Sequence, residues 1–223
     1  MIRPKQIFKV IGIILSLWVI YQGICYGYWF LKMVSKPASH EIEGKFSTMS
    51  SEELVSALYN FDIFSPYPNT AMKMLGERKE QKAVPHLVKF LNSWHRGKRF
   101  FAIRALVQIN DPRAIEPLMK IVRKTSVDTN KYNKELPPFE YFEALTSLAK
   151  MKYEGVYHYA VEFATLDKSR SRFFKGQAIT MLKYFEKPES IPLLKKIADE
   201  HSEWTLHDGA LEAIKHIESS KVK

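Results

Sequence analysis

The sequence contains little cysteine, few turn-forming residues and no recognisable catalytic motif. Its single cysteine, Cys25, excludes a disulfide within the chain and a metal site built from several cysteines. Nine glycines and eleven prolines among 223 residues are too few for a turn-rich all-β protein. Neither a Gly-rich phosphate loop nor a Ser/His/Asp set occurs. We therefore expect a non-enzymatic protein that holds no cofactor and no metal.

Acidic residues are absent from the start of the chain, and the first one is Glu41. The net charge of +10 is correspondingly uneven. Without the five basic residues before Glu41, 29 basic residues remain against 24 acidic ones, a net of +5. The rest of the chain is therefore an ordinary solvated surface or a weak site for anions. The five early bases are Arg3, Lys5, Lys9, Lys32 and Lys36.

A hydrophobic segment, VIGIILSLWVIYQGICYGYWFL, follows the basic tail 1–9. A helix of about 20 apolar residues crosses a bilayer, and aromatic residues gather at the membrane interface. We therefore predict a transmembrane anchor over residues 10–32, followed by a linker over 33–49. A cleaved signal peptide is the alternative, but its apolar core would be shorter, at about 7–15 residues. The flanking bases favour a cytoplasmic N-terminus and a repeat domain on the non-cytoplasmic side.

An alanine with large apolar residues one and four positions later recurs along the remaining chain. These spacings place all three side chains on one helix face, where the small alanine permits close approach of a neighbouring helix. The alanines are 34, 39, 34 and 32 residues apart. The five copies begin at Ala71, Ala105, Ala144, Ala178 and Ala210.

A second apolar pattern alternates with the first and keeps step with it, at 83–91, 114–122, 155–163 and 190–198. Pro112 and Pro188 fit the first turns of such helices. The Ser50-Ser51-Glu52-Glu53 stretch predicts a capped first helix over 51–60. Each helix pair cannot bury its apolar face alone, whereas stacked pairs can. We therefore predict one repeat domain over residues 50–223.

Two stretches, AMKMLGERKEQKAVPHLVKFL and AIRALVQINDPRAIEPLMKIV, resemble HEAT-like repeats of the phycobilisome-lyase type. The match is closest over Ala105–Val122 and covers about residues 70–218. The resemblance implies an all-α fold, a right-handed α-α superhelix (solenoid) of about 4–5 helix pairs. It does not imply lyase activity, because nothing in the sequence marks a bilin site.

Arg99-Phe100-Phe101 and Arg172-Phe173-Phe174 occupy equivalent places, six residues before Ala105 and Ala178. With neighbouring bases they could form a ridge that binds an anionic partner. In the alternative, each arginine bonds turn carbonyls or an acid of the adjacent repeat, and the phenylalanines enter the core. The candidate ridge residues are Arg96, Lys98, Arg99, Arg170 and Arg172.

The segment 125–138 lengthens one repeat, and insertions in a solenoid often emerge on the binding face. Asn130, Lys131, Tyr132 and Asn133 are candidate contact residues there, although a tolerated surface insertion is equally compatible with the sequence. Glu135 and Glu140 flank a Pro-Pro pair, and we expect both to be solvated. His201, Glu203, His207 and Asp208 are better explained as a polar turn than as a metal site.

These features favour a membrane-tethered scaffold that binds an unidentified protein through the concave repeat surface and the 125–138 loop. The alternative is a module that binds nucleic acid or lipid headgroups through the Arg-Phe-Phe ridges. An enzyme with a site assembled across repeats is the third hypothesis, and no residue group favours it.

Overall fold

The computed structural model describes residues 39–59, 67–125, 138–166, 172–200 and 204–220, and every regular element among them is a helix. The chain divides into two units, Met1–Lys45 and Phe46–Lys223. The predicted transmembrane segment 10–32 lies outside the described residues. Within the described part, no helix is both long and apolar enough to span a membrane.

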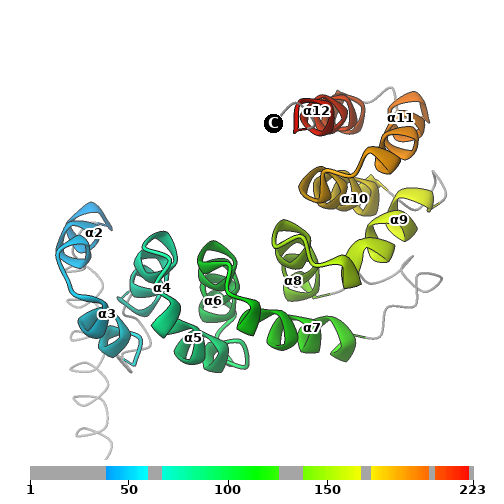
Figure 1. Ribbon diagram of the computed structural model, residues 1–223. Helices are drawn as coiled ribbons and strands as arrows, with labels where there is room; N and C mark the ends of the chain where they lie inside the picture. The colour runs from blue at the N-terminus through cyan, green and yellow to red at the C-terminus, as the bar shows by residue number, and fades with distance from the viewer. Residues whose placement is uncertain (1–38, 60–66, 126–137, 167–171, 201–203, 221–223) are drawn as a thin grey trace, which may run out of the picture. The chain divides into compact units, whose positions relative to one another are not determined.

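Two series of helices alternate along the second unit (Figure 1). Each first-series helix contacts the next one, and second-series helices pack against the first-series helix that follows them. Figure 1 shows the first series on the inner side of this row and the second series on the outer side. The first series is α4 (Tyr67–Glu77), α6 (Arg96–Ile109), α8 (Phe139–Lys150), α10 (Arg172–Phe185) and α12 (Trp204–Ser220). The second is α5 (Val84–Phe90), α7 (Ile115–Lys124), α9 (Tyr157–Thr165) and α11 (Ile191–Glu200).

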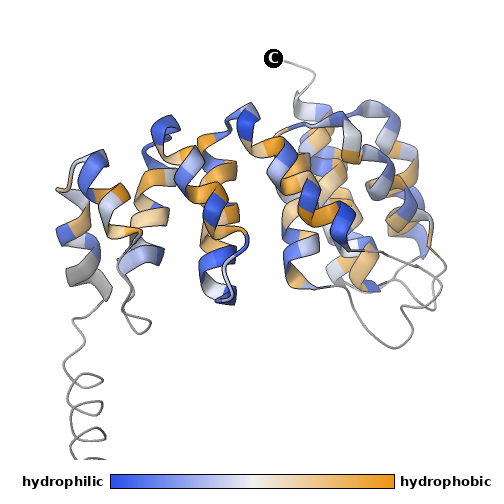
Figure 2. Cartoon of the chain, turned by 90° about the horizontal axis from the view of Figure 1, so that it is seen from below, coloured by the Kyte–Doolittle hydropathy of each residue, from blue (hydrophilic) through white to orange (hydrophobic). Residues whose placement is uncertain are grey.

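The recurrent alanines mark the first-series helices, as predicted. All five are at most 1% exposed, and the apolar residue four positions after each is also buried. At Gly76 and Ala105 the backbones of α4 and α6 come very close together, because a Cβ on Gly76 would lie 2.9 Å from Cα of Ala105. Small residues therefore set the spacing between successive repeats. Figure 2 shows hydrophobic residues along the faces on which the helices meet.

The second-series helices begin with a short 3-10 turn, which reverses the chain after each first-series helix. Pro112 and Pro188 start two of these turns, in the first-turn position that the sequence predicts. The residue that precedes or opens the reversal has a positive φ of about 55°: Lys79, Asn110, Lys152 and Glu186. The same turn geometry therefore recurs in four successive repeats.

Two helices precede the regular series, α2 (Ser39–Ser47) and α3 (Ser51–Ala57). The predicted Ser50 cap is confirmed: Ser50 Oγ accepts from the backbone N–H of Glu53, and the Glu53 carboxylate accepts from Ser50 N–H at 2.7 Å. The linker predicted over 33–49 is in part a helix. Its polar sequence gives no periodic apolar pattern, but Phe46 is buried to 2% exposure, with its ring 5.6 Å from Tyr67.

The last described helix, α12, differs from its equivalents at one apolar position. Leu211 corresponds to the buried Met72, Leu106, Leu145 and Ile179, yet it is 47% exposed. In the other repeats a following first-series helix packs against this side, whereas no described helix follows α12. The exposure of Leu211 is therefore a consequence of its terminal place in the described array.

Candidate partner-binding surfaces

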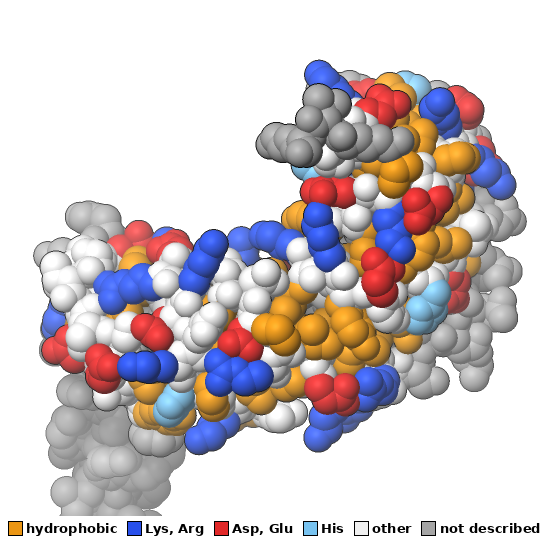
Figure 3. Space-filling view, in the orientation of Figure 1, with side chains coloured by type: hydrophobic (Ala, Val, Ile, Leu, Met, Phe, Trp, Pro, Cys, Tyr) orange, Lys and Arg blue, Asp and Glu red, His pale blue; other side chains and the backbone are white. Residues whose placement is uncertain are grey.

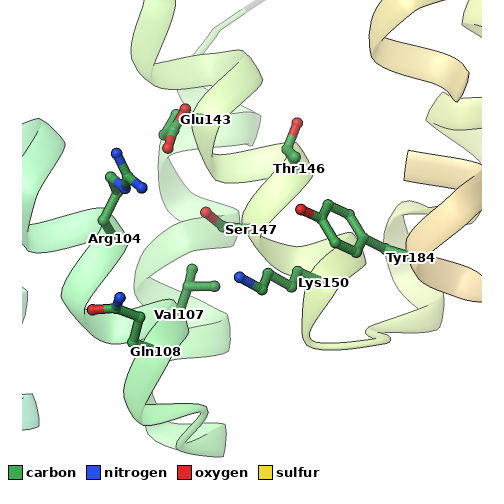
Figure 4. Close-up of a pocket in the computed structure, with 8 residues that line it drawn as sticks. All are labelled: Arg104, Val107, Gln108, Glu143, Thr146, Ser147, Lys150 and Tyr184. Carbon is green, nitrogen blue, oxygen red and sulfur yellow. The ribbon is translucent and has the colours of Figure 1, made fainter. Parts of the chain in front are cut away.

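A pocket of about 150 Å³ opens on the inner side of the row, between α6, α8 and α10 (Figure 4). A second hollow of about 390 Å³ shares Val107, Gln108 and Lys150 with it and continues to the end of α4 at Glu77 and Lys79. We call this continuous depression the inner groove. Its first part is lined by Arg104, Val107, Gln108, Glu143, Thr146, Ser147, Lys150 and Tyr184.

Three charged residues in the inner groove, Arg104, Glu143 and Lys150, form no ion pair within the described part of the chain. The Arg104 guanidinium lies 5.3 Å from the Phe100 ring centre, and the Lys150 amine lies 5.9 Å from that of Tyr184. Glu143 is half-buried, and burial raises the pKa of its carboxyl, although the charge of Arg104 partly opposes this. The groove therefore presents charges of both signs that are not neutralised by direct partners.

Many charged residues elsewhere in the repeat domain are paired with an opposite charge from a distant part of the sequence. Figure 3 shows basic and acidic side chains intermixed on the face that it views. These pairs have N–O distances of 2.6–2.7 Å, and they join residues 25 to 41 positions apart. They are Arg99–Glu140, Lys152–Glu186, Lys175–Glu200, Lys183–Glu212 and Lys187–Glu154. The unpaired charges of the inner groove differ from this pattern.

Arg99, a candidate ridge residue, is engaged within the domain. Its guanidinium donates to the carbonyls of Ser93 and Trp94 at 2.8 and 3.0 Å and to Glu140 at 2.6 Å. The expectation that Glu140 is solvated is therefore wrong, because Glu140 lies in the first turn of α8 within reach of Arg99. Its side chain is 14% exposed. Burial raises the pKa of Glu140, but hydrogen bonds from its own backbone and from Arg99 bring it below the ordinary value.

The other ridge candidates are less constrained. Arg96 is exposed, with its guanidinium 5.2 Å from the Phe139 ring centre, and Lys98 is half-buried in the first turn of α6. Arg172 donates to Thr205 Oγ1 at 3.1 Å. Arg170 and the loop candidates Asn130, Lys131, Tyr132 and Asn133 lie outside the described residues.

Three exposed aromatic residues lie near the N-terminal ends of first-series helices: Phe139 and Phe173 occupy equivalent repeat positions, and Trp94 lies two residues before α6. Trp94 is 78% exposed, Phe139 39% and Phe173 44%. We call the surface formed by Trp94, Arg96, Lys98, Phe139 and Phe173 the aromatic edge. The alternative in which the ridge phenylalanines enter the core holds for Phe174, at 3% exposure, but not for Phe173, and sequence reasoning missed Trp94. A tryptophan in the polar loop NSWHRGK, outside any apolar pattern, was the available signal.

The proposed polar turn near the C-terminus is described only in part. His201 and Glu203 lie outside the described residues, whereas His207 forms a 3.0 Å hydrogen bond between its Nδ1 and the carbonyl of Ala198. The described residues contain no group of three His, Cys, Asp or Glu side chains placed to hold a metal ion.

A comparison of the sequence with protein families agrees with the helical repeats. Residues 52–133 match the family model for HEAT repeats. No curated protein matches the chain. A crystal structure of an engineered protein from the Northeast Structural Genomics Consortium is 19% identical, with a TM-score of 0.49 over 82% of this chain and 85% of that one. The matched residues therefore resemble HEAT repeats, and the described helices continue the same alternation of two helix series up to Ser220.

Proposed function

We propose that this protein is a non-catalytic scaffold that binds a partner protein through the inner groove. The observation that carries the proposal is the set of unpaired charges, Arg104, Glu143 and Lys150, in a depression shared by successive repeats. Solenoid proteins use such extended surfaces, built from equivalent positions of stacked repeats, to bind other proteins. HEAT repeats generally serve as interaction scaffolds of this kind.

The charges of the inner groove suggest which partner it binds. A half-buried carboxylate such as Glu143 loses hydration without gaining an ion pair, and a basic side chain of a partner would compensate that loss. Arg104 and Lys150 would in turn receive an acidic side chain. The groove extends from α10 to the end of α4, which suits an extended segment better than a compact ligand. The proposed partner segment therefore carries a basic and an acidic residue close together.

The remaining elements of the proposal concern residues outside the described part. Residues 10–32 would anchor the scaffold in a membrane, and the 125–138 loop would add contacts beside the groove. The anchor would raise the local concentration of the scaffold near membrane-bound partners. The flanking bases favour a repeat domain on the non-cytoplasmic side. Protease digestion of a C-terminal tag in cells with a permeabilised outer layer would support this orientation, and protection until membrane lysis would contradict it.

Within the HEAT-like repeats, the pattern of Ala105–Val122 supports the phycobilisome-lyase type as the nearest subgroup. This assignment concerns the repeat sequence alone. The proposed scaffold needs no bilin.

Selection of random 12-residue peptides on the full-length chain in detergent micelles would test the groove. We expect the selected peptides to combine Lys or Arg with Asp or Glu. Glu143→Gln and the double variant Arg104→Gln/Lys150→Gln should each weaken their binding about three- to tenfold, the effect of losing a partly exposed charge contact. Replacing residues 126–137 with a Gly/Ser linker of equal length should also weaken binding without loss of helicity.

Matched controls carry the same changes outside the groove. Lys195→Gln on α11 and Glu218→Gln on α12 neutralise exposed residues that line neither part of the groove, so they should leave affinity unchanged. Equal binding to the groove variants and the controls would show that the partner site lies elsewhere. Failure to select any peptide above background would refute peptide binding by this surface.

A further inference from the structure

The aromatic edge has a composition that the scaffold function does not explain. Of the five large apolar side chains that are exposed in the described residues, three belong to it, and they lie near the N-terminal ends of α6, α8 and α10. Exposed apolar side chains scattered singly need no explanation, whereas several gathered on one edge mark an interaction surface. Trp94, at 78% exposure, is the most exposed of the five.

The Phe139 and Phe173 rings are each supported on one side and exposed on the other, whereas Trp94 contacts the ring of its neighbour His95 and is largely exposed. Phe139 contacts Phe100, with ring centres 5.6 Å apart, and Arg96 lies over its face. Phe173 meets Phe142 edge to face at 4.8 Å. Such rings are fixed in place by the domain and still offer apolar surface outward. Aromatic side chains at membrane interfaces act in this way, with one side in an apolar medium and the other near polar groups.

Basic side chains accompany the rings. Arg96 and Lys98 form no ion pair with a described residue, and neither does Lys124 at the end of α7, the helix that leads toward Phe139. The acid that follows Phe139 in the chain, Glu140, is paired with Arg99 at 2.6 Å. This part of the edge is therefore cationic, and basic residues near an anionic bilayer are attracted to its surface.

We propose that the aromatic edge docks on an anionic lipid surface, with Trp94 and Phe139 entering the interface and Arg96 and Lys98 contacting headgroups. Lipid fits better than nucleic acid because an extended phosphate backbone would need a longer basic track than these residues provide. The inference does not depend on the inner groove. Membrane insertion of residues 10–32 would hold the aromatic edge close to the lipid surface. The proposed lipid contacts of the aromatic edge do not themselves require that insertion.

Quenching of Trp94 fluorescence by brominated lipids tests this proposal directly. The full-length variant Trp18→Phe/Trp29→Phe/Trp204→Phe keeps Trp94 as its only tryptophan. In nanodiscs of brominated phosphatidylcholine with 30% phosphatidylglycerol, its emission should fall at least twofold relative to unbrominated discs. Adding Arg96→Gln/Lys98→Gln, or omitting phosphatidylglycerol, should remove most of that quenching.

A tryptophan at position 211 provides the matched control. Leu211→Trp combined with Trp94→Phe in the same background places the probe at another exposed apolar position, on α12 and outside the aromatic edge. This probe should not be quenched. Equal quenching at both positions would mean that the domain lies on the bilayer without orientation, and it would overturn the proposal.

Two further outcomes would also overturn it. One is an unquenched Trp94 in both lipid mixtures. The other is an emission change on adding a 20-nucleotide single-stranded DNA, steeply salt-dependent, with no response to lipid. If the chain does not enter nanodiscs, the anchor proposal fails instead, and the same quenching is then measured with added vesicles of the two compositions.

Discussion

The close approach of α4 and α6 at Gly76 makes a quantitative prediction for Gly76→Ala. A Cβ at this position would lie 2.9 Å from Cα of Ala105 and 3.3 Å from its Cβ, and closer still to Oε1 of Gln108. The glutamine side chain can rotate away, but the Ala105 backbone cannot. The added methyl group therefore forces α4 and α6 apart. Overpacking of this kind costs about 1–3 kcal/mol.

Gly209→Ala in α12 is the matched comparison. Its Cβ would meet nothing nearer than Cγ2 of Ile179 at 3.9 Å, an ordinary contact. Alanine is favoured over glycine inside a helix by about 0.8–1.0 kcal/mol, so this variant should be more stable than the wild type. Gly76 is next to the end of α4, where the propensity gain is smaller. The same chemical change should therefore have opposite signs at the two sites, with a difference of about 2–3 kcal/mol.

Urea and thermal unfolding of the full-length chain, followed by circular dichroism at 222 nm, would measure both effects. For a domain of this size, 1 kcal/mol corresponds to about 2–4 °C in melting temperature. Gly209→Ala should therefore melt a few degrees above the wild type and Gly76→Ala below it, both with an unchanged urea slope. If Gly76→Ala were as stabilising as Gly209→Ala, then α4 and α6 would not meet at this point, and the account of repeat spacing would be wrong.

Two other perturbations test the turns between the helix series. Lys79 has a φ of 54° and forms no ion pair with any residue that the structure describes, so Lys79→Gly should relieve left-handed backbone strain of about 1 kcal/mol and raise the melting temperature by about 2–4 °C. Asp111 accepts hydrogen bonds from the side chain and backbone of Arg113, which lower its pKa. Because the folded pKa lies below the unfolded value, the stability that Asp111 contributes is present above about pH 4 and is lost as the pH falls through the folded pKa. Urea midpoints measured from pH 6 to pH 2.5 should therefore fall more steeply for the wild type than for Asp111→Asn.

The repeat architecture could be predicted because it depends on local periodicity. Ala71 and its four equivalents, and the second-series residues such as Leu87, have spacings that any amphipathic helix pair must show, and the structure buries them. The Ser50 cap was predictable for the same reason, since its partner Glu53 is three residues away. Helix α2 was not, because contacts of this helix come from residues distant in sequence: Phe46 packs against Tyr67, 21 positions later, and Arg78 donates to the carbonyls of Phe46 and Ser47.

The candidate surfaces could not be predicted, because their residues come from different repeats. The inner groove combines α6, α8 and α10, and no spacing rule pairs Arg104 with Glu143 or Lys150 with Tyr184. The same reason explains the error on Glu140, whose partner Arg99 is 41 residues away. For the aromatic edge, the sequence did show that Arg99 and Arg172 occupy equivalent repeat positions. Which of the flanking aromatic residues remain exposed depends on contacts with other repeats, such as those of Phe139 with Phe100 and of Phe173 with Phe142.

Glu143 links the stability of the repeats to the proposed function. Burial raises its pKa in the folded protein, so the unfolded chain ionises first as the pH rises. The folded state is therefore favoured below the ordinary glutamate pKa of about 4.3 and loses stability as the pH rises through the folded pKa. Glu143→Gln removes this penalty, so it should be more stable than the wild type at pH 7 and nearly equal to it at pH 3.5. If Glu143 lowers stability at neutral pH and its replacement also weakens peptide binding, then Glu143 serves binding and not folding. Equal urea midpoints at pH 7 would show that the Glu143 carboxylate is already compensated, which would remove the main physical argument for a basic residue in the partner.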